Sequence, residues 1–148
     1  MNDENKTVAL KVRERIIQAY NKTKDVSWPP SMEYLEKENI IPETLSSFLK
    51  TVIRGDHRKA SSPKLKRLVS SIGQDICWAV MNAEWKLPKH ILMWMMLQNL
   101  YRSKQLVTLL NKLGHSEGNL FSLELETAIA EAVEMSSSTL TNKIIRNP

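Results

Sequence analysis

The chain has 148 residues, of which 42% are hydrophobic and 25% are charged, and this composition excludes a protein that is disordered over most of its length. The length predicts one domain that needs no cross-link, and the single cysteine, Cys77, excludes an internal disulfide and a multi-cysteine metal site. Lys and Arg exceed Asp and Glu by 21 to 16, and the resulting net charge of +5 excludes no class of partner by itself.

Apolar residues recur with the period of an α-helix from the start of the chain. In the first segment they stand four residues apart, at Val8, Val12, Ile16 and Tyr20. This spacing predicts a helix. Pro29 and Pro30 interrupt helical structure, because proline lacks an amide hydrogen, and Ser31 can cap a short helix after them. We expect residues 1–40 to form an N-terminal helical arm and a proline-containing linker.

Capping residues delimit the helices in the middle of the chain. Pro42 suits the first turn of a helix that Gly55 ends. Ser62 and Pro63 begin the next helix as its cap and first residue. Gly73 lies within the apolar stripe of that helix, where it costs about 1 kcal/mol relative to alanine. We attribute this glycine to the close approach of another helix.

Three more helices are predicted in the second half of the chain. Pro88 opens a helix that is apolar almost all round, which is typical of a helix that is central to the core or covered by a partner. Ser103 can cap the next helix, which Gly114 ends. Ser122 can cap the last helix, which a run of serines terminates.

These elements predict an all-α fold, a single compact domain of six or seven helices with an N-terminal helical arm. We expect the helical core domain over residues 41–135 and a frayed tail over residues 136–148. No apolar run is long enough to span a membrane, and the first residues do not resemble a signal peptide. We therefore expect no membrane contact and an intracellular location, in the nucleus or cytoplasm.

The charges are unevenly distributed along the chain. Between positions 54 and 67 a single acid stands among six cations, which are Arg54, Arg58, Lys59, Lys64, Lys66 and Arg67. Positions 113 to 142 hold no Lys or Arg, and their acids are Glu117, Glu124, Glu126, Glu131 and Glu134. Because a basic cluster attracts phosphate backbones, the six cations are candidate contacts to nucleic acid. The alternative is a solvated surface whose counterpart is the acidic stretch of the same chain or of another copy.

A second candidate surface consists of tryptophan and methionine side chains between positions 78 and 96. Trp94, Met95 and Met96 are consecutive, so they cannot all face one narrow side of a helix. The residues that we expect at an interface with a protein partner or a second copy are Trp85, Trp94, Met95 and Met96. The alternative is that these side chains fill the core.

The sequence predicts no enzyme activity, no metal site and no cofactor. The histidines His57, His90 and His115 form no i, i+4 pair and have no cysteine or carboxylate at zinc-ligand spacing. Neither a glycine-rich phosphate loop nor a G-x-S-x-G motif occurs. Cys77 lies two-thirds of the way along a helix that carries an apolar stripe, and it is expected to be a buried small hydrophobe rather than a nucleophile. Any function is therefore expected from binding surfaces.

Three short stretches carry a resemblance to known sequences. They are SSIGQDI at 70–76, PKH at 88–90 and LGHSE at 113–117. From about position 41 to the last residue, the chain resembles uncharacterised animal open reading frames of mobile-element type. The resemblance implies an origin in a mobile element and no particular activity. Some of those relatives carry a cysteine-rich DNA-binding module of the tesmin type, which this chain lacks.

The spacing between His90 and the LGH triplet at 113–115 is similar to that in the C-terminal half of tyrosine recombinases. Those enzymes require cations on the scissile phosphate and a tyrosine nucleophile. Here Met93 replaces the arginine of the histidine-x-x-arginine motif, and no tyrosine follows Tyr101. The resemblance therefore implies a catalytically inactive scaffold in which His90 and His115 approach one another in a basic cleft.

Overall fold

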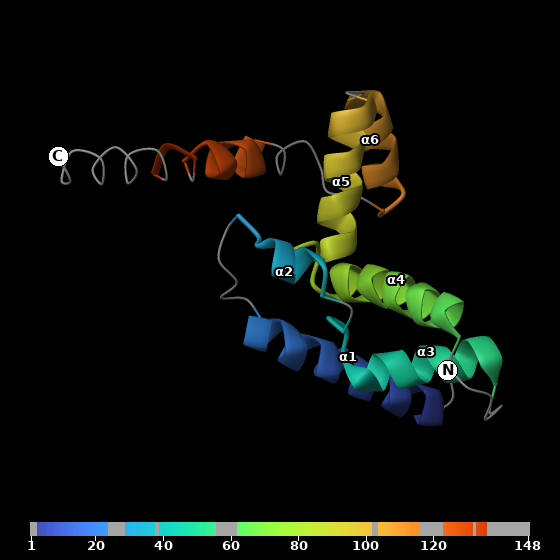
Figure 1. The fold of residues 1–148 in the computed structure, drawn as a ribbon. Coiled ribbons are helices and arrows are strands. Elements are labelled where there is room, and N and C mark those ends of the chain that lie inside the picture. The colour runs from blue at the N-terminus through green and yellow to red at the C-terminus, as the bar shows by residue number, and fades with distance from the viewer. Residues whose placement is uncertain are drawn as a thin grey trace.

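The computed structural model describes residues 3–23, 29–37, 39–55, 62–101, 104–115, 123–131 and 133–135. All regular structure over these residues is helical, which confirms the predicted all-α class. The helices labelled in Figure 1 are α1 (Asp3–Thr23), α2 (Met32–Leu35), α3 (Glu43–Arg54), α4 (Pro63–Val80), α5 (Pro88–Tyr101) and α6 (Lys104–Lys112). Residues 123–131 and 133–135 are also helical, and we call them the C-terminal helix. In the described part of the chain, no helix is long and apolar enough to cross a membrane.

Several helices begin and end where the sequence predicts. The Ser31 hydroxyl accepts a hydrogen bond from an amide three residues later, at 3.2 Å, and so caps α2. The Ser62 hydroxyl caps α4 in the same way, also at 3.2 Å. Gly55 ends α3 with a φ of 69°, in the left-handed region that glycine adopts without strain. The other two predicted serine caps, Ser103 and Ser122, lie outside the described residues.

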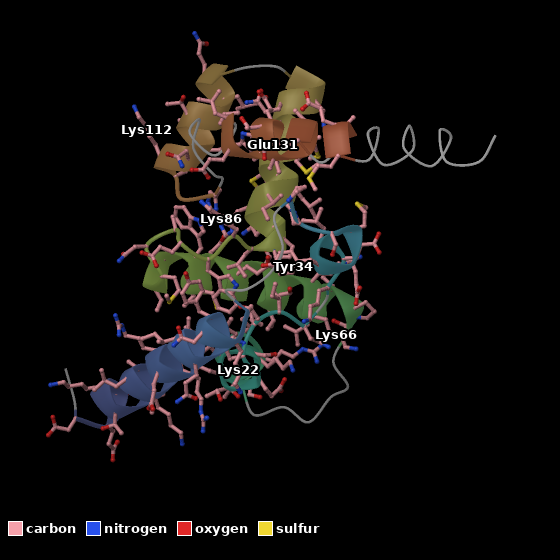
Figure 2. All side chains as sticks on the ribbon, turned by 90° about the vertical axis from the view of Figure 1, so that its left-hand side faces the viewer. Lys22, Tyr34, Lys66, Lys86, Lys112 and Glu131 are labelled. Carbon is pink, nitrogen blue, oxygen red and sulfur yellow. The ribbon has the colours of Figure 1, made fainter. Side chains whose placement is uncertain are left out.

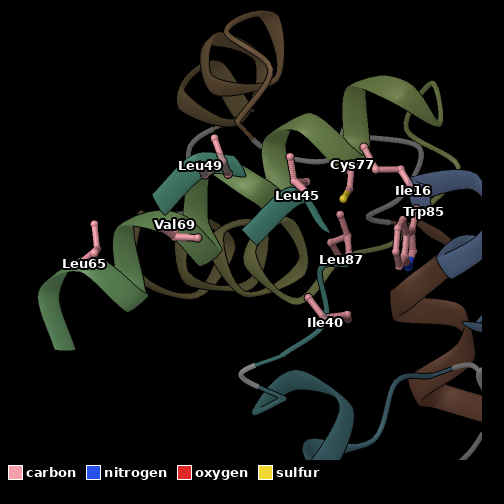
Figure 3. Close-up of a cluster of buried hydrophobic side chains, with 9 residues drawn as sticks. All are labelled: Ile16, Ile40, Leu45, Leu49, Leu65, Val69, Cys77, Trp85 and Leu87. Atoms are coloured by element: carbon pink, nitrogen blue, oxygen red, sulfur yellow. The ribbon is translucent and has the colours of Figure 1, made fainter. Parts of the chain in front are cut away.

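The first core cluster joins α1, α3 and α4, which pack against one another at one end of the molecule (Figures 1 and 2). Figure 3 shows its buried members, which are Ile16, Ile40, Leu45, Leu49, Leu65, Val69, Cys77, Trp85 and Leu87. Ile16 of α1 is completely buried in this cluster. The helical arm therefore packs against α3 and α4 through this cluster. Cys77 is also completely buried, and its burial raises the pKa of the thiol to about 12.

The second core cluster joins α2, α5, α6 and the C-terminal helix. Its buried members are Leu35, Ile91, Trp94, Leu97, Val107 and Leu125. Because α2 and α6 both pack against α5, this helix is largely covered within the chain, which explains why its sequence is apolar almost all round. Its exposed apolar side chains include Leu92 and Met96, which keep 44% and 53% of their surface accessible.

Tyr34 of α2 connects the two clusters. Its ring packs against both of them, and its hydroxyl donates a hydrogen bond of 2.6 Å to the Lys86 carbonyl (both labelled in Figure 2). Burial raises the pKa of Tyr34 to about 12, so the phenol keeps its proton and remains a donor at neutral pH. This contact fixes α2 against the segment that leads into α5.

Gly73 allows the chain before α3 to lie close to α4. A methyl group at this position would overlap the side chain of Ile41, which lies just before Pro42, the residue that caps α3. The sequence predicted close packing by another helix, whereas the neighbour is the turn that leads into α3. Gly73 therefore sets how near the start of α3 approaches α4.

Candidate functional site

A groove with a volume of about 590 Å³ lies at the junction of α3, α4 and the start of α5. Its charged lining residues are four cations, Lys50, Lys66, Arg67 and Lys89, and one carboxylate, Glu43. We call it the cationic groove. Amide and hydroxyl side chains contribute further polar groups, from Asn39, Ser46, Ser70, Ser71 and Gln74. The lining therefore combines a positive charge with neutral hydrogen-bonding groups.

The four cations of the groove differ in their pairing. Lys50 Nζ lies 3.7 Å from a carboxylate oxygen of Glu43, and Lys89 pairs with a carboxylate described below. Lys66 and Arg67 are exposed, and neither forms an ion pair with a described residue (Lys66 is labelled in Figure 2). Their charge is therefore available to an anion from solvent.

The start of α4 adds to the positive potential of the groove. Pro63, the first residue of the helix, lines the groove, and the first turn contains no acidic residue. The aligned peptide dipoles give this end of the helix a partial positive charge, although Pro63 has no amide hydrogen and the Leu65 amide already donates to the Ser62 hydroxyl. Lys66 and Arg67 lie within the first two turns, so the partial charge of the helix end and these side chains have the same sign in this part of the groove.

The structure places the six predicted nucleic-acid contacts in different environments. Lys66 and Arg67 line the groove. Lys64 is exposed on the first turn of α4 but is not part of the lining, and Arg54 is half-buried at the end of α3. The remaining two lie outside the described residues and are Arg58 and Lys59.

Lys89 is a cation of the groove that the sequence reading missed. Its ammonium group lies 2.5 Å from Asp75 Oδ2 and donates a hydrogen bond to the Ser71 carbonyl at 3.3 Å. Its backbone amide donates to the side-chain oxygen of Gln74 at 2.9 Å. These contacts hold the first turn of α5 against α4. The sequence signal was only a lysine after a helix-starting proline, which does not reveal a partner on another helix.

His90 lies next to Lys89 and is completely buried. Its Nε2 is 3.2 Å from Asp75 Oδ1, and its ring stacks on Trp78, with centroids 5.2 Å apart and planes inclined by 19°. Burial lowers the pKa of His90 to about 4, although the nearby Asp75 carboxylate opposes this shift. The imidazole is therefore neutral at pH 7 and adds no charge to the groove.

His115 approaches the same carboxylate from the end of α6. Its Nδ1 is 4.0 Å from Asp75 Oδ2, and its side chain is half-exposed. Together the four residues form what we call the Asp75 cluster, which consists of Asp75, Lys89, His90 and His115. The resemblance to recombinases predicts an approach of the two histidines. In the structure both histidines lie next to the carboxylate of Asp75. This carboxylate accounts for their proximity without a bound phosphate.

The residues predicted to meet a protein partner are divided between core and surface. Trp85 and Trp94 are only 3% and 4% exposed, so they fill the core, as the alternative interpretation holds. Met95 is half-buried, and Met96 is exposed on α5. Because both tryptophans are buried, only Met96 and part of Met95 among these four residues are accessible to a partner.

The described residues include no group of three or more His, Cys, Asp or Glu side chains placed to hold a metal ion. Comparisons with protein-family models, with curated proteins and with solved structures find no match to this chain. We therefore infer a function from the chemistry of the cationic groove.

Proposed function

We propose that this chain is a non-catalytic helical domain that binds nucleic-acid phosphates in the cationic groove. The observation that carries this proposal is the pair of exposed cations, Lys66 and Arg67, which line the groove without an ion pair among the described residues. Lys50 and Lys89 add two further charges to the lining. Since a nucleic-acid backbone carries closely spaced negative charges, several cations in one groove can contact successive phosphates.

Neutral donors in the groove suit phosphate oxygens as well. The Ser70 hydroxyl accepts a hydrogen bond from the Gln74 side chain at 3.3 Å, so its own hydrogen is left to donate. Ser46 and Asn39 offer a further hydroxyl and amide. The Arg67 guanidinium can donate two parallel hydrogen bonds to one phosphate. Such contacts position a backbone, and they are chemically distinct from contacts that identify bases.

The described lining of the groove offers no aromatic surface on which unpaired bases could stack. Among the described residues that line it, the apolar members are Ile41, Pro63 and Val69, and none is aromatic. Binding through backbone contacts alone is independent of base sequence and strongly dependent on salt. We therefore expect similar affinity for duplexes of different sequence.

The Asp75 cluster supports binding and contributes no nucleophile in this proposal. Lys89 and Asp75 pair with each other, and His90 is buried and neutral, so the cluster positions the Lys89 charge at the groove. An origin in a mobile element, which the sequence resemblance implies, agrees with a domain that holds nucleic acid without cleaving it. Both the origin and the lack of catalysis are part of the proposal.

Fluorescence anisotropy with a labelled duplex at low salt tests this function. The variant that combines Lys66→Glu and Arg67→Glu should lose binding, because it reverses both unpaired charges of the groove. A matched control combines Lys11→Glu and Arg13→Glu, which reverse two exposed cations of α1. This control changes the net charge equally and should keep most of the affinity. Equal affinity of the wild type and the groove variant, or equal loss in both variants, would contradict the proposal.

A second candidate function is a protein interface on α5. Leu92 and Met96 stand one turn apart on this helix and are both exposed, which favours contact with an apolar partner or a second copy. Met96→Lys would place a charge in such a contact. Sedimentation of the variant and the wild type tests this alternative, which requires an associated wild type and a monomeric variant.

A further inference from the structure

The C-terminal helix presents several carboxylates on one side. Glu124, Glu131 and Glu134 are separated by seven and three residues, so they lie close to one line along the helix. All three are exposed, and none forms an ion pair with a described residue. Positions 124 to 134 contain no Lys or Arg. This side of the helix, which we call the acidic face, is therefore uniformly negative.

The buried contact of this helix leaves the acidic face outward. Leu125 is 2% exposed and packs in the second core cluster, whereas Ile129 and Val133 are 44% and 58% exposed. With 3.6 residues per turn, Glu131 and Glu134 point about 120° and 180° away from Leu125 around the helix axis. The helix is therefore held by its own chain near its start, while most of the acidic face points away from that contact.

The acidic face and the cationic groove of one chain lie at different levels of the molecule. In Figure 2, Glu131 lies at the level of α5 and α6, whereas Lys66 lies at the level of α4. Figure 1 shows the same separation between the C-terminal helix and the pair formed by α3 and α4. For the acidic face to reach the groove of its own chain, Leu125 would have to leave its buried position.

We propose that the acidic face of one copy binds in the cationic groove of a second copy. The two surfaces are complementary in charge, with three carboxylates on the helix and, in the groove, two cations that form no ion pair with a described residue, Lys66 and Arg67. A reciprocal exchange between two copies makes this contact twice, which strengthens an otherwise weak electrostatic association. A second copy is the favoured occupant because every chain carries both surfaces.

The contact between copies would regulate nucleic-acid binding, and this regulatory role rests on the proposed function. Nucleic acid and the acidic face of a second copy would compete for Lys66 and Arg67. In the dimer each groove would be occupied by the acidic face of the other copy. Nucleic acid would displace the acidic face and so convert dimers into monomers. Salt should weaken both interactions, because both depend on exposed charges.

Sedimentation velocity of the full chain without nucleic acid tests the contact. We expect a shift from monomer towards dimer as the concentration rises from about 1 μM to about 100 μM at low salt. The shift should be lost when salt is raised from about 50 mM to about 200 mM. A wild-type chain that stays monomeric over the whole range at low salt would overturn the proposal.

A charge exchange between two variants tests which surfaces meet. The acidic-face variant combines Glu124→Lys, Glu131→Lys and Glu134→Lys, and the groove variant combines Lys66→Glu and Arg67→Glu. Each variant alone should be monomeric, whereas an equimolar mixture should form dimers, because the reversed helix matches the reversed groove. The control that combines Lys11→Glu and Arg13→Glu should associate like the wild type. Dimers in both single variants, or a monomeric mixture, would overturn the proposal.

The two proposals fail separately in these experiments. If the mixture restores dimers but the wild type does not bind duplex, the contact between copies stands and nucleic-acid binding does not. If the acidic-face variant binds duplex like the wild type and the mixture stays monomeric, nucleic-acid binding stands and the contact between copies does not. When both hold, the acidic-face variant binds duplex at least as tightly as the wild type, because no acidic face competes for its groove and because its three added lysines also attract the duplex.

Discussion

The ammonium group of Lys89 lies 2.5 Å from the carboxylate of Asp75, and this pair joins the cationic groove to the buried His90. The Lys89 side chain is only 16% exposed, so its charge needs a partner. Asp75 is that partner, and it also holds the Lys89 ammonium group at the groove lining. The same carboxylate contacts His90 and His115. Asp75 therefore connects the start of α5 and the end of α6 to α4.

Removing the charge of Asp75 should destabilise the fold. Asp75→Asn keeps the size of the side chain but leaves the Lys89 ammonium without its carboxylate. We expect the free energy of unfolding to fall by about 1–3 kcal/mol, as for a partly buried charged group that loses its hydrogen-bond partner. Urea denaturation measures this change. Glu84→Gln, which alters an exposed carboxylate in the turn before α5, should change the free energy by less than about 0.5 kcal/mol. Equal effects of the two substitutions would contradict the role of Asp75.

The burial of His90 makes stability depend on pH. Its pKa is about 4 in the folded chain against an ordinary value of 6.5, so below pH 6.5 the unfolded chain binds a proton that the folded chain does not. The free energy of unfolding should therefore decrease as the pH falls from about 6.5 to about 4, by about 1.4 kcal/mol for each unit by which the pKa is lowered. His90→Gln does not titrate and should lack this contribution. Urea denaturation at several pH values compares the two proteins, and parallel pH profiles would refute the assignment.

The contact between Gly73 and Ile41 should appear as an energetic coupling. The methyl group added by Gly73→Ala overlaps the Ile41 side chain, and the atom that it meets first is Cδ1. Ile41→Val removes that atom. It should lower the free energy of unfolding by about 0.5–1.5 kcal/mol in the wild type, but by much less in the Gly73→Ala background. A double-mutant cycle from urea denaturation should therefore give a coupling of about 1 kcal/mol. Additive effects would show that the two residues do not compete for space.

The sequence predicts local structure well because the signals for it are local. Ser31, Ser62 and Gly55 mark helix ends by chemistry that acts within three or four residues, and the structure confirms each of them. The apolar stripe that contains Ile16 correctly predicts a helix. The stripe does not show which helix it faces, so the sequence could not place α1 in the core with α3 and α4.

Tertiary contacts explain what the sequence could not show about the site. Trp85 and Trp94 are as apolar in sequence as Met96. Trp94 is buried because α2 and α6 pack against α5, whereas Trp85 is buried in the first core cluster, next to Tyr20 of α1. Met96 stays exposed. Lys89 stands 14 positions from Asp75, on another helix. The groove consequently includes Lys66 and Arg67, which charge clustering predicts, and Lys89, which only the fold reveals.

The salt dependence of nucleic-acid affinity measures how many phosphates Lys66 and Arg67 contact. Each phosphate contact contributes about 0.9 to the slope of log affinity against log salt concentration. If Lys66 and Arg67 each contact a phosphate, the variant that combines Lys66→Ala and Arg67→Ala should bind duplex with a slope shallower than that of the wild type by about 2. Two duplexes of unrelated sequence should show the same change. A slope equal to that of the wild type would contradict the account.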